Sequence, residues 1–259
     1  MSKILIALQF YPGDQEQAMQ LARFLTDLEP GHSQKADILF AGRFDVKHDQ
    51  ATLAHVSRSF NVCPFLSRRQ GAVGWPHGCN ELWFDTMSYI QERIKAKVWP
   101  QYKAILTIEG DCVPLKRDWV DRLHALWDNE RPPTAFCAGA LLSAPADHIN
   151  GNSLWSASLD DLEFVRRIGG ANPGMGWDYQ HAGKFKNRGW HPTDKIISYW
   201  NMQTCDRQTF ENLMATDAAL FHGCKDLSLL SMARAKMLGQ RGLGYEIRPP
   251  QGTRMRVKW

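Results

Sequence analysis

The first forty residues alternate a short apolar run, an amphipathic stretch and a second apolar run. The runs at residues 3–8 and 36–41 are mostly aliphatic, which indicates buried strands. Between them, apolar side chains recur at helical spacing from Ala18 to Leu28, so this stretch is expected to form a helix with one buried face. A strand, a helix and a second strand form a βαβ unit with parallel strands and a right-handed crossover. The sequence therefore predicts an α/β fold with a mostly parallel central sheet flanked by helices.

The rest of the chain continues this alternation. Asp14 is expected to cap the first helix, with Gln17 in the capping-box position. Between residues 144 and 188 the pattern loosens into Gly, Asn, Asp and Trp residues. The further predicted elements are strands at 104–108, 135–141 (a central strand), 196–200 and 218–221, and helices at 80–97, from Asp118 onward, and at 226–238.

Length and composition favour a globular protein. The 259 residues fit one large domain or two small ones, and a hydrophobic content of 44% supports a sizeable core. No apolar stretch is long enough to span a bilayer. The amino-terminal run could pass for a short signal peptide, but it lacks a small-residue cleavage site, so we expect the first strand of a cytoplasmic protein. Six cysteines without a C-x-x-C pair are expected to be reduced, with Cys112 a small buried filler.

The net charge of +4 is unevenly distributed. Residues 239–259 contain five basic side chains and one acidic side chain, so the remainder of the chain is formally neutral. We expect one domain over residues 1–238, followed by this basic tail. The tail favours an anionic partner such as a sugar nucleotide or a nucleic acid; a solvated segment that aids solubility is the alternative.

An acidic turn, Glu109-Gly110-Asp111, directly follows the apolar run at residues 104–108. Carboxylates at the carboxyl end of a buried strand lie where open α/β sheets bind ligands. Two close carboxylates repel each other, so a hard divalent cation that also binds phosphate oxygens would stabilise them together. A solvated turn with two incidental acids is the alternative.

A second polar group lies far downstream, after the apolar run at 218–221. The imidazole of His222 can complete the coordination of a metal, and Lys225 can neutralise phosphate as a point charge. Gly223 would let the backbone approach a diphosphate closely. A histidine at a strand end can also be a purely structural, hydrogen-bonded residue.

The acidic motif after a strand, combined with the late His and Lys, resembles the GT-A class of nucleotide-sugar glycosyltransferases. The resemblance covers most of the chain and implies a single Rossmann-type domain, with a nucleotide-sugar-binding half at 1–112 and an acceptor-binding half at 113–238. The motif here is an E-x-D variant of D-x-D. It implies Mn²⁺ or Mg²⁺ held by Asp111 and His222, with Glu109 binding directly or through water. It also implies transfer of a hexose or pentose from a nucleoside-diphosphate sugar to an acceptor hydroxyl, with Gly110 and Lys225 beside the donor.

The same resemblance implies residues for the nucleoside of the donor. The loop with Gln9 and Tyr11 and the turn with Arg43 and Asp45 would hold the base and ribose. Asp45 would accept hydrogen bonds from a base edge or a ribose hydroxyl; its alternative role is the cap of the following helix.

Two further segments are candidates for the donor sugar. Residues 74–80, from Gly74 to Asn80, resemble the segment that lines the ribose and sugar in this class, or form an ordinary helix-entry loop. Asn150 and Asn152 carry amides that suit sugar hydroxyls, although their Asn-Gly sequence is also typical of a turn.

The glycine-dense segment at 169–178 is expected to be a loop that closes over a bound donor. Trp177 offers a flat face for a sugar or base. Asp178 is the leading candidate for the group nearest the reacting carbon or the acceptor hydroxyl, where it would act as general base, and a helix cap is its alternative. Asp217 is the reserve candidate.

The acceptor is less constrained by the sequence. Basic and aromatic side chains alternate in residues 184–191. Such a segment can contact phosphates and stack on bases. An exposed strand pair is the alternative. Together with the basic tail, this segment favours a hydroxylated base in DNA, as in phage-type DNA-modifying glycosyltransferases; glycan, lipid-linked and protein acceptors are the alternatives. Two other kinds of protein are alternatives. One is a sugar nucleotidylyltransferase, but the Arg and Lys signature of that class is missing at residues 9–14. The other is a non-catalytic nucleic-acid-binding module.

Overall fold

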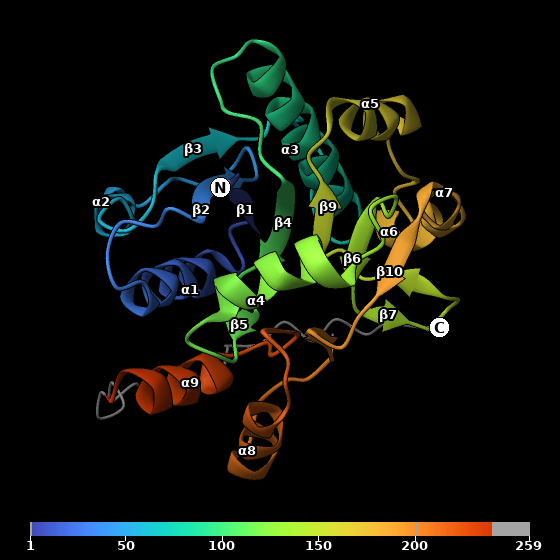
Figure 1. The fold of residues 1–259 in the computed structure, drawn as a ribbon. Helices are drawn as coiled ribbons and strands as arrows, with labels where there is room; N and C mark the ends of the chain where they lie inside the picture. Colours follow the sequence, from blue (N-terminus) through green and yellow to red (C-terminus); the bar gives the residue numbers. More distant parts are fainter. Residues whose placement is uncertain (1, 200, 240–259) are drawn as a thin grey trace.

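The computed structural model describes residues 2–199 and 201–239 and is built around a seven-stranded sheet (Figure 1). The strand order is β10-β6-β9-β4-β1-β2-β3. Within it, β9 runs antiparallel to both of its neighbours and the other pairs are parallel. This confirms the predicted α/β fold with a mostly parallel sheet. The strands are β1 (Ile4–Phe10), β2 (Ala36–Gly42), β3 (Val62–Leu66), β4 (Ala104–Glu109), β6 (Cys137–Gly139), β9 (Leu154–Ser156) and β10 (Trp190–Pro192).

Helices cover both faces of the sheet, and alternate residues of the strands pack against each layer. Ile4, Ile6 and Leu8 of β1 pack with the layer that contains α1, while Leu5 and Ala7 pack with the layer that contains α3. Figure 1 shows α4 in front of the sheet and α3 behind it. The first layer holds α1 (Gln15–Leu28), α2 (Gln50–Val56), α4 (Trp119–Ala125) with the π-turn at Leu126–Glu130, α8 (Arg207–Ala215) and α9 (Ser228–Leu238); the second holds α3 (His77–Lys95), α5 (Leu159–Ile168), α6 (Trp177–Gln180) and α7 (Ala182–Arg188).

A small second sheet joins the end of β4 to the carboxyl-terminal part of the described chain. It contains β11 (Ile196–Ser198), β12 (Leu220–His222) and β5 (Cys112–Pro114) in that order. The strands predicted at 196–200 and 218–221 therefore exist, but they belong to this sheet. A separate two-stranded antiparallel sheet contains β7 (Leu141–Leu142) and β8 (His148–Ile149).

Some predicted elements were wrong or incomplete. The run at 135–141 was expected to be a central strand, but β6 lies next to the edge strand β10. Residues 144–188 contain β8, β9 and three helices, which the pattern missed because the strands are too short to show a period and α5 buries only Leu162 and Val165. The basic and aromatic segment at 184–191 is α7 followed by β10, and not an exposed strand pair.

Asp14 does not cap α1 as predicted. Its carboxylate accepts a hydrogen bond from the Tyr11 backbone N–H at 2.8 Å and makes no side-chain cap hydrogen bond. Gln17 instead donates to the carbonyl oxygens of Cys224 and Asp226, at 2.9 and 3.1 Å. The first turn of α1 is thus tied to the loop after β12.

The predicted domain halves share one central sheet, since β6, β9 and β10 extend the sheet begun by β1 to β4. Of the basic tail, only Gly239 is described; residues 240–259 lie outside the described residues. None of the helices in the described ranges is long and apolar enough to cross a membrane.

Gly110 allows α1 to approach the end of β4 closely. A Cβ atom at this position would lie 2.8 Å from the backbone nitrogen of Ala18 and 3.2 Å from the carbonyl oxygen of Asp14. Both contacts are with backbone atoms, which cannot rotate away. The first turn of α1 is therefore packed directly against the acidic turn.

We predict that Gly110→Ala lowers the free energy of unfolding by about 1–3 kcal/mol, because the added methyl group overpacks this contact. Urea unfolding followed by circular dichroism measures the change. Gly31→Ala is the matched control, because a Cβ there meets no atom within 4 Å. Equal stability of the two variants would contradict the close approach.

Candidate functional site

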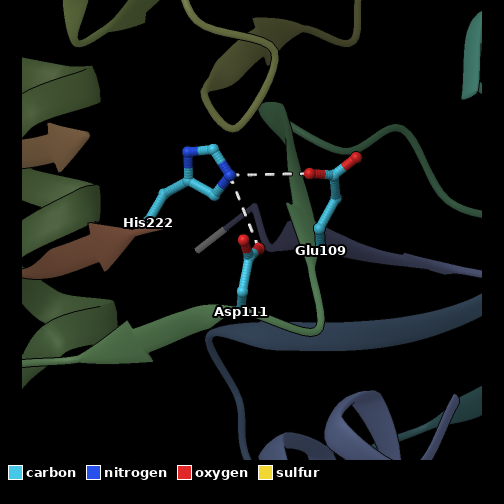
Figure 2. A group of neighbouring side chains, drawn as sticks. All are labelled: Glu109, Asp111 and His222. Carbon is cyan, nitrogen blue, oxygen red and sulfur yellow. Dashed lines mark ion pairs between the residues drawn. The ribbon is translucent and has the colours of Figure 1, made fainter. Parts of the chain in front are cut away.

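Backbone pairing brings two distant segments together at the end of β4. The acidic turn leads directly from β4 into β5, and β5 pairs with β12 in antiparallel register, with His222 opposite Cys112. The N–H of Gly223 also donates to the carbonyl oxygen of Asp111 at 3.2 Å. The side chains of Glu109, Asp111 and His222 consequently meet at one point (Figure 2).

The three side chains form a compact group of potential metal ligands. His222 Nε2 lies 3.5 Å from Glu109 Oε2 and 3.4 Å from Asp111 Oδ1, and one ligand atom from each residue lies within 4.8 Å of the others. In Figure 2 the imidazole edge points between the two carboxylates. Asp111 and His222 are buried, whereas the Glu109 side chain is 37% exposed, so the group is accessible from the Glu109 side.

Two atoms of this group fit a divalent cation because they lack other partners. Asp111 Oδ1 and His222 Nε2 are buried and have no hydrogen-bond partner among the described residues. Such buried polar atoms are costly unless something satisfies them. Two carboxylates and an imidazole are a suitable ligand set for Mn²⁺, while Mg²⁺ prefers oxygen ligands alone.

The charges of the group are mutually stabilised. Burial raises the pKa of Glu109, but His222, Lys225 and Asn152 together lower it to about 2. Burial lowers the pKa of His222, and the facing carboxylates of Asp111 and Glu109 outweigh this effect and raise it. The facing carboxylates therefore favour the protonated form of the imidazole.

Lys225 contacts the same aspartate from the other side. Its Nζ lies 2.5 Å from Asp111 Oδ2, and its side chain is 42% exposed. Burial lowers the pKa of Lys225, but Asp111 outweighs this and raises it, so the ammonium stays charged. Gly223 has a φ of +125°, a conformation that favours glycine, and this allows the backbone to turn between His222 and Lys225.

Ser198 orients the imidazole and was missed by sequence reasoning. Its Oγ lies 2.9 Å from His222 Nδ1, because β11 and β12 pair in parallel register with Ser198 beside His222. This contact leaves Nε2 directed at the carboxylates. A serine in a short apolar strand gave no signal, since the register between β11 and β12 is not visible in the sequence.

Asn150 and Asn152 were predicted to contact sugar hydroxyls, but both are buried. Asn152 Oδ1 accepts from the Glu109 backbone N–H at 2.8 Å, and Asn152 Nδ2 lies 3.4 Å from Glu109 Oε2. Asn150 Oδ1 in turn accepts from the Asn152 N–H at 2.9 Å. Asn152 thus holds Glu109 in place, and Asn150 holds Asn152.

Gln9, Tyr11 and Asp14 border the acidic turn. Gln9 is paired with Glu109 across β1 and β4, and its buried Nε2 has no hydrogen-bond partner in the described ranges. Burial raises the pKa of Asp14 to about 8, and the nearby charges of Glu109 and Asp111 add to the rise. Burial also raises the pKa of the Tyr11 hydroxyl, with Asp14 contributing. Asp14 is a neighbour of the site that the sequence indicated only as a cap.

Arg43 and Asp45 bind each other. The guanidinium donates to both carboxylate oxygens of Asp45 at 2.7 Å and lies over the Tyr11 ring, 5.6 Å from its centroid. Both Asp45 oxygens are thus engaged, contrary to the predicted hydrogen bonds to a base or ribose. The alternative helix cap is also wrong, because Asp49 caps α2 through the N–H groups of residues 51 and 52.

Gly74 and Asn80 lie at the start of α3. Gly74 has a φ of +72° where the chain turns into the helix. Asn80 is buried and holds the glycine-dense loop, since Nδ2 donates to the Met175 carbonyl at 2.7 Å and Oδ1 accepts from the Trp177 N–H at 3.0 Å. Asn80 is therefore engaged with this loop and not free for a ribose.

Trp177 is a core residue, contrary to the prediction of a stacking face for ligands. It is buried and stacks on Trp83 with ring centroids 3.6 Å apart. Together with the Asn80 contacts, this fixes the carboxyl end of the loop at 169–178. The loop is also held at Asn172, whose carbonyl accepts from Asn80 Nδ2 at 3.3 Å and whose N–H donates to Gln180 Oε1 at 2.6 Å.

Asp178 directly follows Trp177. Its Oδ2 accepts from the Gly151 N–H at 3.0 Å. Burial raises the pKa of Asp178, the charge of Glu109 adds to the rise, and His148 and two backbone N–H groups oppose it. Asp217 lies elsewhere: it is exposed, pairs with Arg122 and Lys195, and precedes β12, whose opposite end carries His222. Asp217 therefore has no part in the proposed site.

Among the comparisons with known proteins, the one with solved structures identifies the fold. No protein-family model matches the sequence, and no curated protein matches it. The structure is similar to WbbM, a bifunctional glycosyltransferase, with a TM-score of 0.51 and 11% identity over 85% of this chain and 45% of that one. It is also similar to a glycosyltransferase involved in glycosylation of the major capsid of PBCV-1, with a TM-score of 0.50 and 13% identity over 92% and 100%.

At such identities the likeness shows the fold alone, which is of the GT-A type. The chain spans less than half of WbbM and the whole length of the PBCV-1 protein. The chemistry must therefore be argued from the residues themselves.

We predict that Ser198→Ala weakens Mn²⁺ binding by about 10–100-fold, as loss of a hydrogen bond behind a metal-binding histidine typically does. Isothermal titration calorimetry measures the affinity. Ser198→Thr keeps the hydroxyl and is expected to retain binding. If the alanine variant binds as tightly as the wild type, Ser198 does not orient His222.

Proposed function

We propose that this protein is a metal-dependent glycosyltransferase that moves a sugar from a nucleoside-diphosphate sugar to an acceptor hydroxyl. The observation that carries the proposal is the meeting of Glu109, Asp111 and His222, with two buried ligand atoms unpartnered in the part of the chain that the structure describes. The group lies at the carboxyl end of β4, where open α/β sheets bind ligands. The GT-A-type fold supports the same reaction class.

In this proposal, Asp111 and His222 hold Mn²⁺ or Mg²⁺, and Glu109 binds directly or through water. A divalent cation there would neutralise the negative charge of a departing nucleoside diphosphate. Lys225 adds a positive charge on the same side, and Gly223 leaves room beside it. Asn152 and Ser198 hold the ligands Glu109 and His222 in place.

The nucleoside of the donor is assigned to the ends of β1 and β2. Tyr11 presents an exposed ring, and the Arg43 guanidinium, which is paired with Asp45, lies over it. Gln9 Nε2, which has no hydrogen-bond partner among the described residues, offers a donor for a polar group of the ligand. Residues around Gly74 and Gly110 border this region.

Asp178 is the proposed base for the acceptor hydroxyl. Burial raises its pKa, which makes a carboxylate a stronger proton acceptor. The Gly151 N–H fixes its orientation. The acceptor itself is proposed only as a hydroxyl-bearing molecule.

A hydroxylated DNA base remains one predicted acceptor, beside glycans and lipid-linked sugars. The basic tail that favoured DNA lies almost wholly outside the described residues. Within α7 and β10, Arg188 pairs with Asp161, and Lys186 lies over the Trp190 ring. These cations therefore already have partners within the protein.

We predict that Mn²⁺ together with the cognate nucleoside-diphosphate sugar raises the melting temperature of the wild type and not of Asp111→Asn. At a ligand concentration 100 times its Kd, binding stabilises a folded protein by about 2.7 kcal/mol. A thermal-shift screen of UDP- and GDP-sugars with and without Mn²⁺ measures this. Asp217→Asn, an exposed aspartate away from the site, is the control and should respond as the wild type does.

An unchanged response of Asp111→Asn would refute the assignment of the metal. Release of pyrophosphate from a nucleoside triphosphate and a sugar phosphate would instead identify a nucleotidylyltransferase. Salt-sensitive DNA binding without any response to sugar nucleotides would identify a nucleic-acid-binding module.

For Asp178→Asn, we predict a fall in kcat of about 10²–10⁴-fold, the usual contribution of a general base. The Kd of the donor, measured by calorimetry with Mn²⁺, should change little, since Asp178 is assigned to the acceptor side. A variant that loses donor affinity and keeps kcat would place Asp178 on the donor instead.

A further inference from the structure

The two carboxylate oxygens of Asp111 face two different cations. Oδ1 lies 3.4 Å from His222 Nε2, and Oδ2 lies 2.5 Å from Lys225 Nζ. The ammonium therefore makes the tightest contact with the residue that is best placed to hold a metal. A divalent cation and an ammonium at one carboxylate repel each other, so each weakens the binding of the other.

The backbone that carries Lys225 is fixed, while its side chain reaches the surface. The Lys225 N–H donates to the Met202 carbonyl at 2.9 Å, and Gln17 binds the carbonyls of Cys224 and Asp226. The side chain is 42% exposed and has four rotatable carbon–carbon bonds beyond this anchor. The ammonium can therefore leave Asp111 without any movement of the loop.

We propose that the Lys225 ammonium stays paired with Asp111 until a diphosphate binds. Lys225 thereby couples the binding of a divalent cation to the binding of a diphosphate. This inference rests on the proposed function. A diphosphate offers the ammonium a new anionic partner and frees Asp111 Oδ2. Because coupling between two ligands is reciprocal, each then tightens the binding of the other.

The neighbouring charges favour such an exchange. The carboxylates of Glu109 and Asp111 make the region acidic, so a diphosphate alone is repelled. The ammonium on Asp111 hinders a metal alone. When both ligands bind, the metal pairs with the Asp111 carboxylate and the diphosphate pairs with the Lys225 ammonium. Joint binding of metal and diphosphate is therefore favoured over binding of either ligand alone.

The test is a set of Mn²⁺ titrations, followed by electron paramagnetic resonance, without and with saturating inorganic pyrophosphate. We expect pyrophosphate to tighten Mn²⁺ binding to the wild type by at least about fivefold, the lower end of typical coupling. Lys225→Gln should bind Mn²⁺ alone at least about fivefold more tightly than the wild type, and pyrophosphate should then add little. Lys236→Gln, with a similarly exposed lysine that pairs with Glu211, is the matched control and should behave as the wild type.

Two outcomes would overturn the inference. Equal or weaker binding of Mn²⁺ alone to Lys225→Gln would show that the ammonium does not compete with the metal. Coupling that is unchanged in Lys225→Gln would show that Lys225 does not transmit it. Circular dichroism of each variant confirms that the fold is retained.

If the proposed metal-dependent function itself is wrong, the same titrations give a different result. If Asp111→Asn binds Mn²⁺ as the wild type does, or if neither the wild type nor Lys225→Gln binds it, the metal site itself is wrong. A second measurement follows Lys225 directly through the NMR signal of its ¹³C-methylated ammonium, assigned by its absence in Lys225→Gln. That signal should shift when Mg²⁺ and pyrophosphate are added together, and an unchanged signal would contradict release from Asp111.

Discussion

The pairing of β5 with β12 is the constraint on which the site depends. Three residue pairs in antiparallel register place His222 opposite Cys112, one residue beyond Asp111. Because successive side chains of a strand point to opposite faces, a slip of one residue would turn the imidazole away from the carboxylates. The same register fixes Ser198, since β11 pairs with β12 on the other side. A backbone ladder of three residues thus determines which side chains can share a ligand.

Concentrated negative charge is the second determinant of the site. The carboxylates of Glu109 and Asp111 lie close together, and burial together with their charges raises the pKa of Asp14 to about 8. His222, Lys225 and the amino-terminal turn of α1, which packs on Gly110 and contributes a partial positive charge, lie beside them. Asp111 Oδ1 and His222 Nε2 have no hydrogen-bond partners among the described residues. These two atoms are therefore available to bind a cation.

The sequence predicted the features that depend on residue type and period. The strands that became β1, β2 and β4 were visible as aliphatic runs, and the carboxyl end of β4 was correctly expected to carry two carboxylates near His222. Features that depend on which way a side chain faces were not predictable. Trp177 and Asn80 are residue types common in ligand sites, but here they are buried against Trp83 and the loop at 169–178.

The central claim is that Asp111 and His222 share one divalent cation. The most direct measurement is an anomalous difference map from crystals soaked in Mn²⁺ and collected near the manganese absorption edge. The account predicts a single strong peak at bonding distance from the Asp111 carboxylate and from His222 Nε2, with Glu109 beside it. A map without a peak there, or with manganese bound only at other residues, would contradict it.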